Sequence, residues 1–178
     1  MEKETFPLER LHDEGRINIV FREPARRKYG NRVIILGAGT FIELQKGAED
    51  ILGDEASAVF YEAGIRSGKE GAETMMEEYD KRGLELIEQV NDLIGPSGMG
   101  WGKIEVFEID LEQAKGYYRI SNSFIGNTYG PSDKPVCHFL CGLTVGMLGE
   151  ILGISLTCEE TKCQAKGDPY CEFHFERY

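Results

Sequence analysis

The chain has 178 residues, of which 41% are hydrophobic and 29% charged, and its formal charge at pH 7 is -11. This length predicts one domain with one core, and this composition excludes a disordered chain. The negative charge argues against direct binding of nucleic acid, because phosphate contacts need a basic surface.

No apolar run is long enough to cross a bilayer, so we expect no membrane insertion. The first 14 residues carry many charges and lack the apolar core of a signal peptide, which predicts a cytoplasmic protein. The five cysteines are then expected to be thiols or metal ligands, because disulfides are rare in a reducing compartment.

In chain order, residues 1–15 are expected to form an N-terminal tail, and residues 16–178 a single domain. The stretch "RINIVF" alternates weakly and the apolar stretch "VIIL" is typical of a buried strand. The segment "GAGTFIEL" then opens a helix, for which Thr40 is the predicted N-cap and Glu43 its capping-box partner.

Two helices follow, at residues 55–79 and 83–94, and the second ends before a Gly-Pro pair. A last helix follows Pro135. The first and last of these helices carry glycines on one side at helical spacing, which are Gly64, Gly68 and Gly71, then Gly142, Gly146, Gly149 and Gly153. Glycine weakens a helix, so each stripe implies a close backbone approach, either within the core or at a homodimer seam.

Between these helices, "KIEVFEIDL" and "GYYRISNSF" are predicted to be antiparallel strands. After the last helix, a hairpin with its turn at residues 166–169 places Cys171, Phe173 and Phe175 on one face of the closing strand. We therefore predict an α+β fold, with an antiparallel sheet of about four to five strands and helices packed against it.

The C-terminal hairpin also has the ligand spacing of a metal site. Glu160, Cys163 and Cys171 lie at intervals that let one hairpin supply several zinc ligands, and Cys137 is the natural fourth. In a regular strand Glu160 and Cys163 would face opposite sides, so the site requires a bulge or turn near Thr161.

The spacing leaves a second interpretation open. Unpaired cysteines are often buried as small hydrophobic residues, in which case no metal is bound. Cys141 and Cys158 are either substitute ligands or core residues.

Several segments resemble the 4-vinyl reductase domain family, from about Asn31 onward. They read "FYEAGIRSGKEGA", "GWGKIEVFEID", "PVCHFLCG", "EETKC" and "GDPYCEF". The family includes archaeal stand-alone proteins, a bacteriochlorophyll-biosynthesis component and the sensor domains of phenol-responsive activators. The resemblance implies a metal held by Cys137, Glu160, Cys163 and Cys171. It also implies a fold similar to the TRAPP tethering subunits, and a homodimer.

By this resemblance the chain is a zinc-containing sensor or carrier domain that binds a small apolar or aromatic ligand. Three thiolates and a carboxylate complete a tetrahedron, which makes the site structural, and thiolates favour zinc over iron. Sensing would need a separate regulatory protein as output. The candidate pocket residues are aromatic: Phe60, Tyr61, Trp101, Phe107, Tyr117, Tyr118, Phe124, Tyr129 and Phe139.

Two alternatives have other sequence requirements. An enzyme or accessory protein in tetrapyrrole vinyl reduction would need hydride-transfer machinery, and the dinucleotide fingerprint that begins at Gly37 and Gly39 is broken at Ile42. The family name alone supports catalysis, so the enzyme question stays open, with no catalytic residue assigned. A dimeric interaction module would instead use the glycine-bearing helices at its interface.

Overall fold

A computed structural model gives the structure of the chain and describes residues 36–94 and 100–178. Of the two compact units, Met1–Arg32 and Val33–Tyr178, the described residues belong to the second. The predicted tail, its boundary at residue 15 and the strand at residues 16–21 lie outside the described residues. So does the second predicted strand, except Leu36, which precedes the first described helix.

The helices follow the predicted order. They are α2 (Ala38–Leu52), the short 3-10 helix η1 (Gly53–Glu55), α3 (Ala56–Tyr79), α4 (Gly83–Ile94) and α5 (His138–Leu152). The predictions for α3 and α4 are confirmed. Among the described residues, none of the helices is both long enough and apolar enough to cross a membrane.

The predicted N-cap of α2 is wrong. The helix begins at Ala38 with Gly37 as its N-cap, two residues before the position predicted from Thr40. The backbone N–H of Thr40 already donates to the Gly37 carbonyl at 3.0 Å. The capping-box pattern misled because the close match of Thr40 and Glu43 falls inside the first turn.

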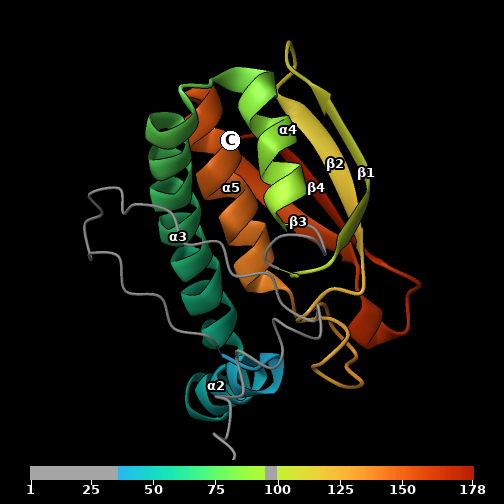
Figure 1. The fold of residues 1–178 in the computed structure, drawn as a ribbon. Helices are drawn as coiled ribbons and strands as arrows, with labels where there is room; N and C mark the ends of the chain where they lie inside the picture. Colours follow the sequence, from blue (N-terminus) through green and yellow to red (C-terminus); the bar gives the residue numbers. More distant parts are fainter. Residues whose placement is uncertain (1–35, 95–99) are drawn as a thin grey trace, which may run out of the picture. The chain divides into compact units, whose positions relative to one another are not determined.

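Four strands form one antiparallel sheet in the order β1-β2-β4-β3. They are β1 (Lys103–Asp110), β2 (Lys115–Ser121), β3 (Leu156–Lys162) and β4 (Cys171–Arg177). Figure 1 shows α3, α4 and α5 on one side of this sheet. The described residues therefore confirm the predicted α+β fold, with its antiparallel sheet and C-terminal helix and hairpin.

The two faces of the sheet differ as a half-buried sheet requires. Tyr118, Phe173 and Phe175 point toward the helices and are buried, and the Tyr118 and Phe173 rings stack at 4.7 Å. Their neighbours on the opposite face, such as His174 and Glu176, are exposed.

The glycines bring α3 and α5 into backbone contact within the chain. A Cβ atom on Gly142 would lie 1.8 Å from the carbonyl oxygen of Tyr61, and one on Gly64 would lie 2.2 Å from that of Phe139. The space beside these glycines is thus filled by the partner helix of the same chain, so the predicted alternative of a homodimer seam at the stripe is wrong. The close approach also turns Val59 outward, where it is 51% exposed.

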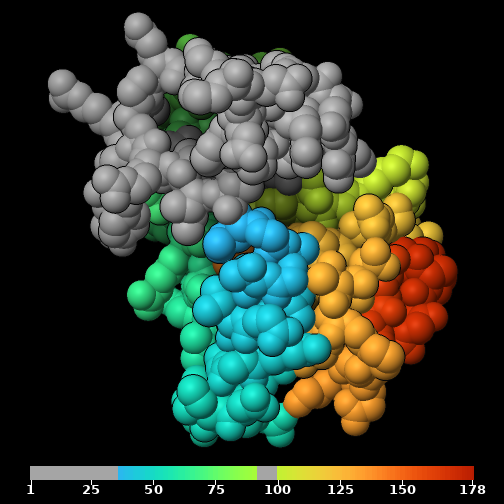
Figure 2. Space-filling view, turned by 60° about the horizontal axis from the view of Figure 1, so that its bottom comes forward, coloured from blue at the N-terminus to red at the C-terminus, as the bar shows by residue number. Residues whose placement is uncertain are grey.

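Helix α2 lies beside the segment that leads into α5 (Figure 2). The side chain of Gln45 is buried and its Nε2 donates to the carbonyl oxygen of Val136 at 3.0 Å. The hydroxyl of Tyr129 donates to Glu49, and Lys134 pairs with Asp54. These contacts fix α2 against the residue that precedes Cys137.

Candidate metal centre

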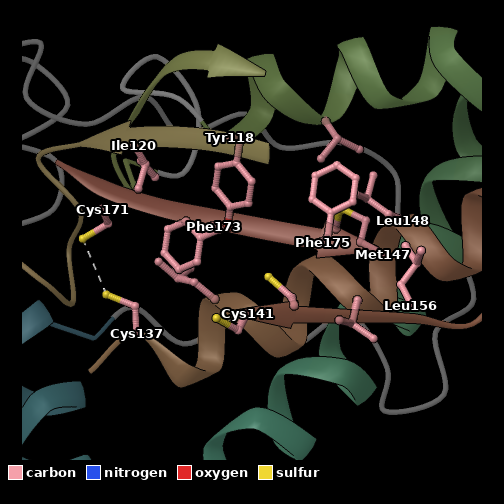
Figure 3. Close-up of a cluster of buried hydrophobic side chains, with 14 of the residues drawn as sticks. Tyr118, Ile120, Cys137, Cys141, Met147, Leu148, Leu156, Cys171, Phe173 and Phe175 are labelled. Atoms are coloured by element: carbon pink, nitrogen blue, oxygen red, sulfur yellow. Dashed lines mark hydrogen bonds between the residues drawn. The ribbon is translucent and has the colours of Figure 1, made fainter. Parts of the chain in front are cut away.

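The structure brings the four predicted ligand residues together. One ligand atom each from Cys137, Glu160, Cys163 and Cys171 can be chosen so that all lie within 4.8 Å of one another. The three cysteines have no exposed surface and Glu160 is 6% exposed. Figure 3 shows the sulfur atoms of Cys137 and Cys171 pointing toward one another, and they are 3.8 Å apart.

The irregularity that the sequence required is present in β3. The β3–β4 pairing shifts between Glu160 and Lys162, so that Thr161 is an extra residue in the ladder. Without this bulge Glu160 and Cys163 would point to opposite faces of the sheet. The bulge lets strand β3 and the residue after it supply two ligands to one point.

The start of α5 orients the carboxylate of Glu160. Cys137 is the N-cap of α5, and its backbone N–H donates to Oε2 of Glu160 at 2.8 Å. The other oxygen, Oε1, is buried and has no hydrogen-bond partner among the described residues. A buried carboxylate oxygen without a partner is costly. A bound cation would satisfy it.

The turn between β3 and β4 holds the remaining two thiols. It contains the short helix η2 (Gln164–Lys166), and the backbone N–H of Gln164 donates to Sγ of Cys171 at 3.3 Å. The backbone N–H of Cys163 donates to Oδ2 of Asp168 at 2.9 Å. Amide donors directed at sulfur stabilise a thiolate, which is the form that binds metal.

The loop after β2 closes the centre from the other side. A Cβ atom on Gly126 would lie 2.7 Å from Sγ of Cys171 and 3.4 Å from Sγ of Cys137. The hydroxyl of Ser123 lies 3.8 Å from the same Cys137 sulfur. The sequence analysis missed both residues, because nothing local marks a glycine or serine that contacts a site built from distant segments of the chain.

The electrostatics of the centre call for a cation. Burial raises the pKa of Glu160 to about 8, and the neighbouring Cys163 thiol contributes to this rise. Burial also raises the pKa of Cys137, whereas hydrogen bonds from Cys137 and Cys171 lower the pKa of Cys163 to about 2. Four acidic groups this close resist full ionisation on their own, because a buried charge is costly beside a like charge. A divalent cation would remove that penalty, so the residues fit a metal.

The other two cysteines lie outside this group. Cys141 and Cys158 are buried in the core, and the thiol of Cys158, followed by burial, raises the pKa of Cys141. The backbone N–H of Cys158 donates to the hydroxyl of Tyr61 at 3.2 Å. Of the two roles left open for these cysteines, the structure places them as core residues.

The aromatic candidates divide into separate environments. Phe107 stacks on Phe175 inside the sheet, whereas Tyr117 lies on the opposite face and stacks on His174. Four others meet around one residue that the sequence analysis missed, Phe41 of α2. Its ring lies 5.9 Å or less from three of them, and the cluster consists of Phe41, Phe60, Trp101, Phe124 and Phe139.

This aromatic cluster lies next to the metal centre. Phe139 follows Cys137 by two residues at the start of α5, and Phe124 precedes Gly126 by two residues in the closing loop. All five rings are half-buried.

Three solved structures share this fold. The sensory domain of the phenol-responsive activator PoxR, solved with phenol, has a TM-score of 0.70 and 23% identity, over 83% of this chain and 78% of that one. Subunit 3 of the trafficking protein particle complex of Naegleria fowleri, covalently bound to palmitic acid, has a TM-score of 0.59 and 15% identity, over 79% and 95%. A vinyl-4-reductase family protein of Methanocaldococcus jannaschii has a TM-score of 0.52 and 19% identity, over 84% and 99%. At these identities the likeness shows the fold alone.

A sequence relative extends over most of the chain. The phenol regulator MopR of Acinetobacter guillouiae is 29% identical over 152 residues, which cover 79% of this chain and 27% of MopR. The chain thus spans about a quarter of the length of that regulator. The family model of the 4-vinyl reductase domain matches residues 117–177, which include all four residues of the candidate metal centre. This match identifies residues 117–177 as a 4-vinyl reductase domain and confirms the resemblance to that family.

Proposed function

We propose that the chain is a small-molecule-binding domain, acting as a sensor or carrier, whose Cys3Glu centre holds a structural zinc ion. The observation that carries the metal part is the buried ligand set, in which Glu160 keeps one oxygen without a partner among the described residues. Four protein ligands complete a tetrahedron and leave no position for water, which is the pattern of structural zinc sites. Three thiols favour zinc over iron.

The metal part is tested by the metal content of protein purified without added metal. We expect about one zinc ion per chain, as for a four-ligand structural site. Cys171→Ser should lose the ion, because it removes one ligand. Cys158→Ser is the matched control, since it changes a buried cysteine outside the group. Protein without zinc or iron, together with unchanged folding of Cys171→Ser, would contradict the assignment.

The ligand part rests on the similarity to MopR and on the aromatic cluster defined above. MopR is a phenol regulator by name, and the similarity covers 79% of this chain. Aromatic side chains that converge from separate elements offer the apolar contacts by which proteins bind small aromatic compounds. We therefore propose a small apolar or aromatic ligand, bound beside the metal centre.

Trp101 makes this part directly testable, because it is the only tryptophan of the chain and belongs to the cluster. Phenol should change the Trp101 emission and raise the melting temperature, since a ligand of the native state stabilises it. Cyclohexanol, of similar size but not aromatic, is the control compound. Binding should weaken in Phe139→Leu but not in Phe107→Leu, which alters a ring outside the cluster. No effect of any aromatic compound would contradict ligand binding, whatever the metal content.

We further propose a homodimer that uses the exposed face of α2. Leu44 and Ile51 are spaced by two helical turns and are 60% and 83% exposed, and Leu52 at the end of the same helix is 43% exposed. Clustered exposed apolar side chains mark interaction surfaces. A dimer here replaces the glycine seam that the sequence left open.

A further inference from the structure

The outer face of the sheet carries a groove at the end remote from the metal centre, with a volume of about 740 Å3. Its side chains form two rows that cross all four strands. The first row is Glu108, Tyr117, His174 and Glu159, and the second is Asp110, Lys115, Glu176 and Thr157. The described helices pack on the other face of the sheet, so they leave this groove open (Figure 1).

The groove has an excess of negative charge. It contains four carboxylates and one ammonium group, that of Lys115. Among the described residues, none of these carboxylates takes part in an ion pair. Carboxylates left without a counter-charge in a concave surface attract a cation that approaches from solution. The groove is therefore electrostatically complementary to a basic partner.

The same face already shows how it binds a guanidinium group. The Nε atom of Arg119 lies 2.7 Å from Oε2 of Glu172, a carboxylate that is 6% exposed. The Arg119 guanidinium also lies over the rings of Tyr170 and Tyr117, at 4.9 Å and 5.4 Å from their centroids. A carboxylate and an aromatic ring together thus hold one arginine.

The groove repeats this pair of groups without an arginine. The ring of His174 stacks on Tyr117 at 5.4 Å with an angle of 17° between the planes. Across the sheet from His174 lies Glu159, its partner in β3. The side chain of His174 is 51% exposed. A ring and a carboxylate are thus both accessible to an arginine supplied by another molecule.

We propose that this groove is a docking surface for an arginine- or lysine-bearing segment of a partner protein. The groove crosses four strands, a width of roughly 14 Å, which corresponds to about four residues of extended chain. Small-molecule sites enclose their ligand, whereas this groove is open along its length and suits a peptide segment. The contact is small, so binding is weak and sensitive to salt. The inference goes beyond the proposed function and needs neither the metal nor the aromatic ligand.

The test uses the full chain and a fluorescein-labelled heptapeptide of alternating glycine and arginine, measured by fluorescence anisotropy at low salt. Glu159→Gln with Glu176→Gln should lower the affinity about fivefold or more. Glu73→Gln with Glu77→Gln removes the same charge from exposed positions on α3 and should change it less than about twofold. Lys115→Gln should tighten binding, because it removes the cation that repels the peptide.

Several results would overturn the proposal. The first is no binding of the peptide at low salt, and the second is equal weakening by the two double variants, which would mean attraction to the net charge alone. A third is equal binding of a peptide with citrulline in place of arginine. Spermidine that binds as tightly as the peptide would assign the groove to a small cation instead. All variants are surface isosteres, and circular dichroism confirms that each retains its fold.

Discussion

At the scale of single residues, Glu160 determines whether the centre can hold a metal. Its Oε2 atom is fixed by the N–H of Cys137, which leaves Oε1 directed to no protein donor among the described residues. Hydrogen bonds of this kind orient a ligand before the metal binds. The carboxylate is thus held in place by the same helix start that supplies one of the thiols.

Glu160→Gln should lower zinc affinity by about tenfold or more, because an amide oxygen is a weaker ligand and carries no charge. The change keeps the size of the side chain and an acceptor for the Cys137 N–H. Competition with a zinc chelator measures the affinity. The control is Glu159→Gln, one residue earlier on the opposite, exposed face of β3. If both variants bind zinc as the native protein does, Glu160 is not a ligand.

At the scale of secondary-structure elements, the contact between α3 and α5 is defined by what the glycines lack. A Cβ atom on Gly146 would lie 2.1 Å from the carbonyl oxygen of Ile65, and one on Gly68 would lie 2.3 Å from that of Leu143. These neighbours are backbone atoms of a helix and cannot rotate away. The helices would have to separate to accept a methyl group.

Gly146→Ala should therefore destabilise the fold by about 2 kcal/mol or more, although alanine favours a helix by about 1 kcal/mol. Gly71→Ala is the matched control, since its Cβ atom would meet only the flexible end of Met147 at 3.3 Å. That variant should be neutral or slightly stabilising. Urea unfolding measures both. Equal stability of the two variants would show that the α3–α5 contact is looser than described.

The sequence predicted those parts of the site that depend on local rules. Strand parity placed Glu160 and Cys163 on opposite faces and so required the bulge that the structure has at Thr161. The hydrogen bond from Cys137 to Glu160 and the approach of Gly126 join segments far apart in the chain. No periodicity encodes such contacts, so they needed the folded structure.

The same division applies to the helices. Apolar periodicity gave the bounds of α3 and α4, but it placed Val59 in the core, and that side chain is exposed. The reason is that the glycines, which carry no apolar side chain, form the buried face of α3. Likewise the glycine spacing indicated a close approach without naming the partner, which is a long-range property.

At the scale of the whole molecule, the exposed apolar face of α2 concerns assembly. Ile51→Asp should convert the proposed dimer to a monomer, because a carboxylate would be buried without a partner at the seam. Light scattering after size exclusion measures the mass. Asp50→Ser, an exposed change beside it, is the control and should leave the mass unchanged. A native protein that is already monomeric at high concentration would contradict the dimer.

The metal centre and the glycine contact hold the molecule in different ways. The centre joins the start of α5 to both ends of the β3–β4 turn and to the loop after β2. The glycine contact joins α3 and α5 along their length through packing alone. Only the first depends on a ligand, so removal of the metal should loosen one end of the molecule before the rest.

Chelation should thus produce a local and then a global effect. Amide hydrogen exchange should rise first at the β3–β4 turn and at the first turn of α5, while the middle of α3 stays protected. Global stability should depend on free zinc, with about 2.7 kcal/mol gained at a zinc concentration 100-fold above the dissociation constant. This gain arises because zinc binds the folded chain and the unfolded chain lacks the assembled site. Uniform loss of protection along α3 and α5 would instead mean that the metal centre supports the whole core.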